Sequence, residues 1–550
     1  MLFNSFAFPI FFAVVLLAYW LLKRSIRYQN ALLLISSYFF YGWWDPRFLT
    51  LIAISTALDY SCARLIQGDR FNASDRIKVG AFSIVSFTLF LGLDFSALGS
   101  LAEFNLTLLF EPLLENRFLI AGLSITVVVS SCLVPLGNKL TLEARKRLFV
   151  TVSVVSNLVI LGIFKYFNFF ASSLSELLQL AFGYTPNELT LNIILPVGIS
   201  FYTFQTMSYT IDVYRGKLTA CRSLLDLATY VSFFPQLVAG PIERGAHLLP
   251  QFQKPRSVSI ENIKSGLWLI LWGLYKKVVI ADNVAIIVNT TFGPWDKLDT
   301  ALTTPQDGVR ILVAVYAFAF QIYCDFSGYS DIARGTSKLM GFDLMLNFKL
   351  PYFSRSPSEF WQRWHISLSS WLRDYLYIPL GGNRSGSFGT YRNLMLTMLL
   401  GGLWHGASWT FVLWGAYQGG ILVAYRLFAP NIGIKETKAS TALFQWFFML
   451  QLTCIGWLIF RARNMETVLT FLESIFTSLK ISSDAIQNLG TLLFYIWPLI
   501  IFQLVQYFKR DMEPTHKWHW FAQVNIWLFL LWGIISLANR SSQDFIYFAF

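Results

Sequence analysis

Two histidines carry the strongest chemical signals in this sequence, and the first is His405. It lies in the segment Gly-Gly-Leu-Trp-His-Gly at residues 401–406, inside an apolar run at 394–425 that contains no Asp, Glu, Lys or Arg. Ionisable residues are costly at membrane depth and usually mark function there. The flanking glycines remove side-chain bulk, so a substrate or a neighbouring backbone can approach the imidazole closely. The structural alternative is a histidine that hydrogen-bonds a carbonyl of a neighbouring helix.

The second histidine, His365, lies in an aromatic stretch at 360–377. Apolar side chains recur there at spacings of three and four, which predicts one amphipathic helix. Ser356, Pro357 and Glu359 come just before it and form a helix-start signal with a capping box. The helix is too polar to span lipid, so we expect it to lie in the interface or to dip into the protein. A surface helix is the alternative, although a lipid anchor has no use for a histidine on its aromatic face.

Several residues near the histidines are candidates for substrate binding. Asp325 stands at the end of an apolar span, where its carboxylate could orient a histidine or satisfy a helix N-terminus. Asn383 and Arg384 follow a glycine pair in a turn that could hold a phosphate, although a structural turn explains this pattern equally well. We also expect three residues just before the histidines to lie along a substrate path: Arg363, Trp364 and Trp404.

The chemistry that these side chains allow is acyl transfer. A hydroxyl that attacks a thioester needs a base, and histidine, with an unperturbed pKa of about 6.5, suits that role. Apolar surroundings favour the neutral form, which is the form a base requires. We assign the base to His405 and a helper role to His365, either polarising the thioester carbonyl or orienting the acceptor. Neither histidine has a Gly-x-Ser-x-Gly elbow nearby, so we expect no serine nucleophile.

The composition predicts an all-α polytopic membrane protein. Of the 550 residues, 55% are hydrophobic and 13% are charged, whereas a soluble domain carries about 25% charged residues. The apolar runs have the length of spanning helices rather than barrel strands. The formal charge of +12 is spread over short loops, which indicates topology signals and contacts with anionic lipid, not nucleic acid. The five cysteines form no CxxC pair, so we expect neither disulfides nor a metal site.

Basic loops alternate with loops that lack such charge. Lys and Arg gather at 23–27, 64–78, 139–147 and 215–222, which predicts that these loops are cytoplasmic and that the N-terminus is outside. The predicted spans lie near 6–22, 31–44, 48–65, 80–98, 118–136, 148–170, 193–211, 265–288, 309–322, 394–425, 443–460, 492–507 and 524–537.

Two apolar stretches do not fit a simple span. Residues 233–241 are too short to cross and contain two prolines and a glycine, which predicts a re-entrant segment, with an interfacial loop as the alternative. The run at 394–425 is too long for one straight span. Gly401-Gly402 or Gly415 could break it, and whether the chain then crosses once or turns back stays open.

Five blocks of the sequence together resemble the bacterial branch of the membrane-bound O-acyltransferase family, and most of all its polysaccharide-acetylating members. The resemblance runs from about residue 20 to residue 463, so we expect a family core at 1–463 and an extension at 464–550 with two further spans and an aromatic tail. It implies a helical fold with a central tunnel and with re-entrant and interfacial helices. His405 matches the catalytic histidine of the family, and His365 matches the second histidine of its pattern. The blocks are residues 195–205, 234–242, 324–331, 360–383 and 401–409.

The resemblance also implies an activity and a place in the cell. It implies a multi-pass enzyme of the bacterial inner membrane that takes an acetyl group from a cytoplasmic thioester, acetyl-CoA, without a bound cofactor. The acceptor implied is an extracytoplasmic polysaccharide, reached through a periplasmic partner of the SGNH esterase-like type. An alginate-like exopolysaccharide is favoured, while cellulose, other exopolysaccharides and peptidoglycan stay open. Arginines that could attract the phosphates of the donor are Arg355, Arg363, Arg373, Arg384 and Arg392.

Other classes of function predict features that the sequence lacks. A proton-coupled transporter that uses His405 as a relay is the alternative, and it would show several intramembrane acids and paired inverted halves. Neither is evident. A pure scaffold would have no need for two histidines in aromatic settings.

The last eight residues form an aromatic tail with one phenol, Tyr547. The basic loop at 509–517 is predicted to be cytoplasmic, so the final span carries the tail, and the C-terminus, outside. An aromatic belt at the interface is one interpretation. However, the tail is similar to the C-terminal motif of the small companion protein in D-alanylation of teichoic acid, and this resemblance implies a tyrosine that carries the acyl group. A phenol, with a pKa of about 10, leaves more readily than a sugar hydroxyl.

Overall fold

The chain folds into helices. A computed structural model describes residues 1–69, 71–93, 106–137, 139–184, 190–191, 194–293, 307–384, 386–428, 439–539 and 545–546. Among these residues there is no strand, and six helices are long and apolar enough to cross a membrane. The predicted all-α polytopic class is confirmed. Its physical basis is that every backbone polar group in lipid needs a partner within the protein, and a helix supplies these partners within one segment.

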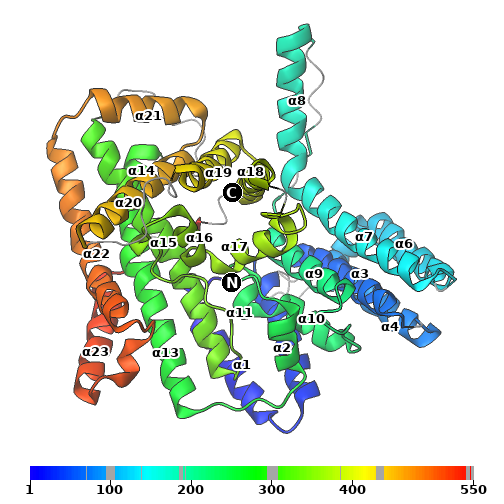
Figure 1. The fold of residues 1–550 in the computed structure, drawn as a ribbon. Helices are drawn as coiled ribbons and strands as arrows, with labels where there is room; N and C mark the ends of the chain where they lie inside the picture. Colours follow the sequence, from blue (N-terminus) through cyan, green and yellow to red (C-terminus); the bar gives the residue numbers. More distant parts are fainter. Residues whose placement is uncertain are drawn as a thin grey trace. The chain divides into compact units, whose positions relative to one another are not determined.

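The first of two compact units comprises residues 1–258 and 340–343. A buried polar cluster joins its central helices, because Asp59 of α3 accepts hydrogen bonds from Asn157 of α7 (3.0 Å) and Thr210 of α9 (3.3 Å). The helices of this unit (Figure 1) are α1 (Ala7–Leu21), α2 (Ile26–Gly42), α3 (Leu49–Gln67), α4 (Ala73–Gly92), α5 (Leu106–Glu115), α6 (Arg117–Gly137), α7 (Leu142–Leu161), η3 (Gly162–Tyr166), α8 (Phe167–Phe182), α9 (Ile199–Tyr214), α10 (Leu224–Ser232), α11 (Phe234–Leu237) and α12 (Gly245–Phe252).

The predicted re-entrant segment at 233–241 is a broken, buried piece of this unit. It contains only the single-turn helix α11, and each of its residues is buried. Its polar groups have partners: the backbone N–H of Phe234 donates to Ser37 Oγ (3.0 Å), and Gln236 Nε2 donates to Gln205 Oε1 (2.8 Å). Irregular backbone is tolerated at membrane depth when it is satisfied in this way, so the burial favours a re-entrant segment over an exposed interfacial loop.

The second unit comprises residues 259–339 and 344–550. The helices expected as a C-terminal extension are part of this unit, where α21 and α22 contact α15 and α23 contacts α13. Its helices are α13 (Ile260–Leu274), η4 (Tyr275–Ala281), α14 (Asp282–Phe292), α15 (Gly308–Leu339), α16 (Pro357–Arg363), α17 (Ile366–Leu372), η6 (Arg373–Tyr377), α18 (Gly386–His405), α19 (Trp409–Phe428), α20 (Ala439–Arg461), α21 (Met465–Thr477), α22 (Ser483–Lys509) and α23 (Trp520–Leu537).

One span of this unit is much longer than predicted. The apolar run at 309–322 is the first part of α15, which continues to Leu339, so the expectation that the span ends at Asp325 is wrong. The helix continues because its acids have partners on the π-helical segment η4. Asp325 pairs with Lys277 and Asp331 pairs with Lys276, both at 2.8 Å. Buried charges persist only when they are paired and hydrogen-bonded, and the hydropathy of one segment does not reveal such pairing.

Candidate active site

His405 stands at the tip of a helical hairpin. α18 ends at His405 and α19 begins at Trp409, and the two helices pack against each other. The long apolar run therefore turns back on itself after His405, and the predicted breaks at the upstream glycine pair or at Gly415 are wrong. A Cβ on Gly402 would overlap the carbonyl oxygen of Phe411, and one on Gly415 would overlap that of Met398. These glycines allow the two helices to approach closely instead of breaking them.

Aromatic rings surround the imidazole of His405, which is only 4% exposed. The ring of Trp414, from α19, lies 5.1 Å from it, and that of Phe460, from α20, lies 5.4 Å from it. Trp404 completes the set at 5.1 Å, and all three contacts are edge-on. Such a cage keeps bulk water away from the imidazole, which suits a residue that acts on a thioester that water could otherwise hydrolyse.

His365 lies between two short helices and not within one long helix. The helix-start signal is confirmed, because the N–H of Glu359 donates to Ser356 Oγ at 3.2 Å. However, α16 ends at Arg363, and His365 adopts a left-handed backbone conformation (φ 43°) before α17 begins. The prediction of one continuous helix at 360–377 is therefore wrong.

Asn347 explains this break, because it offers the start of α17 better partners than a continued helix would. Its backbone carbonyl accepts from the N–H of Ile366 (2.9 Å), and its side-chain oxygen accepts from the N–H of Ser367 (3.3 Å). These are among the N–H groups that a helix start leaves without an internal partner. Asn347 belongs to the irregular segment after α15, and no sequence pattern pointed to it.

The same asparagine sets the tautomer of His365. A backbone N–H can only donate, so the Asn347 atom facing Ser367 must be the amide oxygen, and its Nδ2 then donates to Ser330 Oγ (3.3 Å). His365 Nδ1 lies 3.2 Å from that oxygen and therefore carries the proton. Nε2 consequently holds the lone pair. Burial lowers the pKa of His365, which lies outside the six candidate spans, to about 3, so the ring is neutral at physiological pH.

Trp404 brings the two histidines together. Its ring lies 6.0 Å from His365 and 5.1 Å from His405, edge-on to both. The ring of Phe326, from α15, lies 4.7 Å from the ring of His365. Trp364 instead belongs to an aromatic core, where its ring lies 4.8 Å from Trp457. Of the two tryptophans expected along a substrate path, the structure therefore places Trp404 between the histidines and Trp364 in packing.

Three other predicted binding residues have different surroundings. Arg363 is half-buried, and its guanidinium pairs with Glu359 of the same helix (2.6 Å) and reaches the Leu350 carbonyl (3.4 Å). Asn383 and Arg384 are exposed in the turn after η6. None of the ring contacts and hydrogen bonds described above for His365 and His405 involves these three side chains.

Asp325 belongs to a buried charge cluster that also holds the end of the chain. Lys277 lies 2.8 Å from the carboxylates of both Asp325 and Asp282. The second oxygen of Asp325 accepts the backbone N–H of Ile546 at 2.7 Å. Among the described contacts Asp325 does not orient a histidine, but it does accept a backbone N–H, that of Ile546, where the chain enters a 3-10 helical conformation. Of its two predicted roles, the contacts therefore favour the one at a helix start. A signal for Lys277 was present, since a Lys-Lys pair inside the apolar run at 265–288 is as unusual as His405.

The residue before Ile546 connects this cluster to the histidines. The ring of Phe545 lies 4.7 Å from Tyr329 and 6.0 Å from Phe326. Phe326 also contacts His365, so the end of the chain lies one ring away from the site. Phe545 and Ile546 are 1% and 3% exposed. Tyr547, predicted to carry an acyl group, lies outside the described residues.

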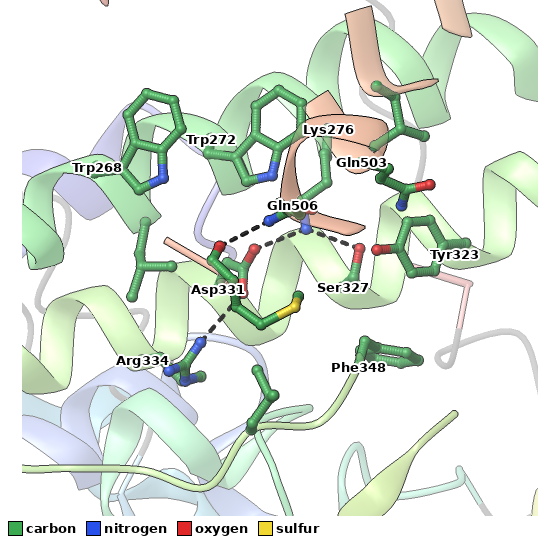
Figure 2. Close-up of a pocket in the computed structure, with 14 residues that line it drawn as sticks. Trp268, Trp272, Lys276, Tyr323, Ser327, Asp331, Arg334, Phe348, Gln503 and Gln506 are labelled. Atoms are coloured by element: carbon green, nitrogen blue, oxygen red, sulfur yellow. Dashed lines mark hydrogen bonds and ion pairs between the residues drawn. The ribbon is translucent and has the colours of Figure 1, made fainter. Parts of the chain in front are cut away.

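A small polar cavity lies beside the site (Figure 2). Lys276 points into it and donates to Ser327 Oγ and to Asp331, both at 2.8 Å, and Trp272 forms part of its wall. The cavity holds about 20 Å³, which is room for about one water molecule. Phe348 also lines it, and the ring of Phe348 lies 6.4 Å from that of His365. Phe348 therefore connects the polar cavity around Lys276 with the surroundings of His365.

A buried histidine pair in a helical membrane fold is compatible with acyl transfer, and comparison with known proteins supplies the class. The model of the membrane-bound O-acyltransferase family matches residues 220–462, a range that includes both histidines. A probable alginate O-acetylase from Pseudomonas putida is 36% identical over the full length of both chains, and one from Pseudomonas aeruginosa is 38% identical over 93% of this chain and 83% of its own. A peptidoglycan O-acetyltransferase from Helicobacter pylori is 32% identical over 74% of this chain and 83% of its own.

The chain belongs to the membrane-bound O-acyltransferase family. It is an acyltransferase and a multi-pass protein of the bacterial inner membrane.

Proposed function

We propose that this chain transfers acetyl groups from acetyl-CoA, supplied from the cytoplasm, towards an extracytoplasmic polysaccharide, of which an alginate-like exopolysaccharide is favoured. The observation that carries the proposal is the pair His405 and His365, joined by Trp404 in an aromatic, buried setting. The relatives support the acetyl group and the kind of acceptor, because two are named for alginate and one for peptidoglycan acetylation. None of them supports the transporter alternative.

His405 acts as the general base in this proposal. It removes the proton of the acceptor hydroxyl while the hydroxyl oxygen bonds to the thioester carbon. The carbon–sulfur bond then breaks, and the departing thiolate takes the proton from the imidazolium, so that charge and protons balance. The aromatic cage favours this role, since it keeps competing water away from the thioester.

His365 orients the acceptor rather than polarising the thioester carbonyl. Polarisation requires an N–H donor, but the Nδ1 proton is directed at Asn347 and Nε2 holds a lone pair. A neutral Nε2 accepts a hydrogen bond from a hydroxyl and can hold it for attack. Of the two helper roles expected for His365, the tautomer therefore favours the second.

Replacement of Asn347 tests this role. We expect Asn347→Leu to lower the rate roughly 5- to 150-fold, the equivalent of about 1–3 kcal/mol for a buried hydrogen-bonding group left without its partner. Asn347→Asp keeps the acceptor oxygen and should restore much of the rate at high pH. The added carboxylate favours the imidazolium form of His365, so the rate of this variant should fall as the pH falls. The wild-type rate should show no such decrease caused by protonation of His365. Equal pH profiles for wild type and Asn347→Asp would contradict the role of positioning residue.

The donor side and the orientation of the chain are tested together by vesicles of known sidedness. Basic loops in the cytoplasm place the N-terminus and the C-terminus outside. Inverted membrane vesicles should therefore release free CoA when acetyl-CoA is added outside them, and right-side-out vesicles should not. Release by right-side-out vesicles alone would refute both the orientation and the cytoplasmic donor, and release by neither would refute the acetyltransferase itself.

Tyr547 is proposed as an acyl carrier between His405 and a periplasmic partner of the SGNH type. An aromatic belt would leave the tail exposed to lipid, whereas Phe545 and Ile546 are buried and the Ile546 N–H is held by Asp325. The phenol would take the acetyl group from the thioester, and the partner would move it from the phenol ester to a hydroxyl of the polymer. The buried anchor directly before Tyr547 supports this route.

A further inference from the structure

A groove of about 660 Å³ opens in the first unit, whereas every candidate active-site residue belongs to the second. Its lining residues come mainly from α2, α4 and the start of α10, with Phe252 from the end of α12. This volume is in the range of ligand sites, about 300–1,000 Å³. The proposed acyltransferase function does not use the groove.

Three cations line the groove near the starts of α2, α4 and α10. Arg27 is the second residue of α2, Lys78 is in the second turn of α4, and Arg222 directly precedes Ser223, the N-cap of α10. All three cations are exposed. Within the described part of the chain, Arg27 and Lys78 form no ion pair. Arg222 forms one long pair, with Asp69 at 4.0 Å. Because these helices begin near the cations, their positive ends add to the attraction for an anion.

Apolar side chains follow the cations along the same helices. Leu34 is two turns beyond Arg27, Phe82 is one turn beyond Lys78, and Leu225 follows the start of α10. All three are half-buried. One acid also lines the groove, Asp226, but its Oδ1 accepts a hydrogen bond from Asn30 Nδ2 at 2.8 Å. The lining is thus cationic near the starts of the three helices and apolar further along them.

We propose that this groove binds one anionic phospholipid of the phosphatidylglycerol type. Its phosphate lies among Arg27, Lys78 and Arg222, and an acyl chain follows Leu34, Phe82 and Leu225. A free phosphate would leave the apolar side chains unused, and a neutral lipid would leave Arg27 and Lys78 without an ion pair among the described residues. A ligand with an anionic head and a hydrocarbon chain matches both kinds of lining residue. The cations belong to the loops predicted to be cytoplasmic, which places the lipid in the inner leaflet.

The test is retention of phosphatidylglycerol by the full chain, measured by native mass spectrometry after release from nanodiscs of phosphatidylcholine and phosphatidylglycerol. We expect wild type to retain one phosphatidylglycerol and the triple variant Arg27→Gln, Lys78→Gln, Arg222→Gln to bind it roughly 100-fold more weakly, since each cation near an anionic lipid contributes about fivefold. The matched control is Lys23→Gln, Arg24→Gln, Lys217→Gln, which removes the same charge from exposed positions in two of the three basic loops that carry the tested cations. An equal loss of bound phosphatidylglycerol in the test and control variants would show that only net charge matters, and it would overturn the proposed site.

A second variant tests the apolar wall. Leu225→Trp narrows the groove and leaves the three cations in place, so it should also lose the bound lipid while its melting temperature without phosphatidylglycerol stays that of wild type. Soluble glycerophosphoglycerol should not displace the lipid from wild type. Displacement by this headgroup alone, or full retention by Leu225→Trp, would show a phosphate site instead of a lipid site and would overturn the proposal.

Discussion

Replacing His405 with alanine should reduce acetyl transfer by roughly two to four orders of magnitude, the usual contribution of a general base. His405 is in position for that role, because it ends α18 and has the rings of Trp404, Trp414 and Phe460 around it. The measurement is release of CoA from acetyl-CoA by the purified chain in nanodiscs, together with acetylation of polymer in cells.

Two further variants separate loss of the base from loss of packing. Alanine leaves a void among three rings, so part of its effect could be structural. His405→Gln fills much of that space and can hydrogen-bond, but it cannot take up a proton, and we expect it to be as inactive as His405→Ala. His519→Ala removes an exposed histidine outside the site and should keep the wild-type rate. Near-normal transfer by a folded His405→Gln variant would remove the base assignment.

The second large effect is expected from Tyr547→Phe, which should abolish acetylation of the polymer. This change keeps the aromatic ring and removes only the hydroxyl, so packing of the tail should persist. If the phenol carries the acetyl group, no other hydroxyl of the tail at 543–550 can replace it. Tyr214→Phe, at an exposed position of the first unit, is the matched control and should keep full acetylation. Full polymer acetylation by Tyr547→Phe would return the tail to an anchoring role.

The carrier also predicts an intermediate that can be isolated. Labelled acetyl-CoA should place an acetyl ester on the C-terminal peptide of wild type, and hydroxylamine should remove it. His405→Ala should form none, because its base is missing. An Asp325→Asn variant keeps an acceptor for the Ile546 N–H but weakens the pairing with Lys277, so its yield of ester should lie between these two. Equal labelling of wild type and His405→Ala would show that His405 does not activate Tyr547.

Properties that depend on local composition were accessible from the sequence. Apolar runs predicted helices because the lipid requires each segment to satisfy its own backbone, and the helix start at Ser356 followed from local capping chemistry. The motif around His405 pointed to the catalytic family, and relatives confirm that family. These signals hold because each depends on a few neighbouring residues and on the cost of charge in lipid.

Contacts between distant segments were decided only by the tertiary structure. The helix break at His365 depends on hydrogen bonds to Asn347. The buried carboxylate of Asp325 depends on its ion pair with Lys277, and the two histidines are connected by the ring of Trp404. The glycines at 402 and 415 look like helix breakers in isolation, yet they are the places where α18 and α19 approach each other. In each case a partner far along the chain supplies a hydrogen bond, a counter-charge or a close surface that outweighs the local preference.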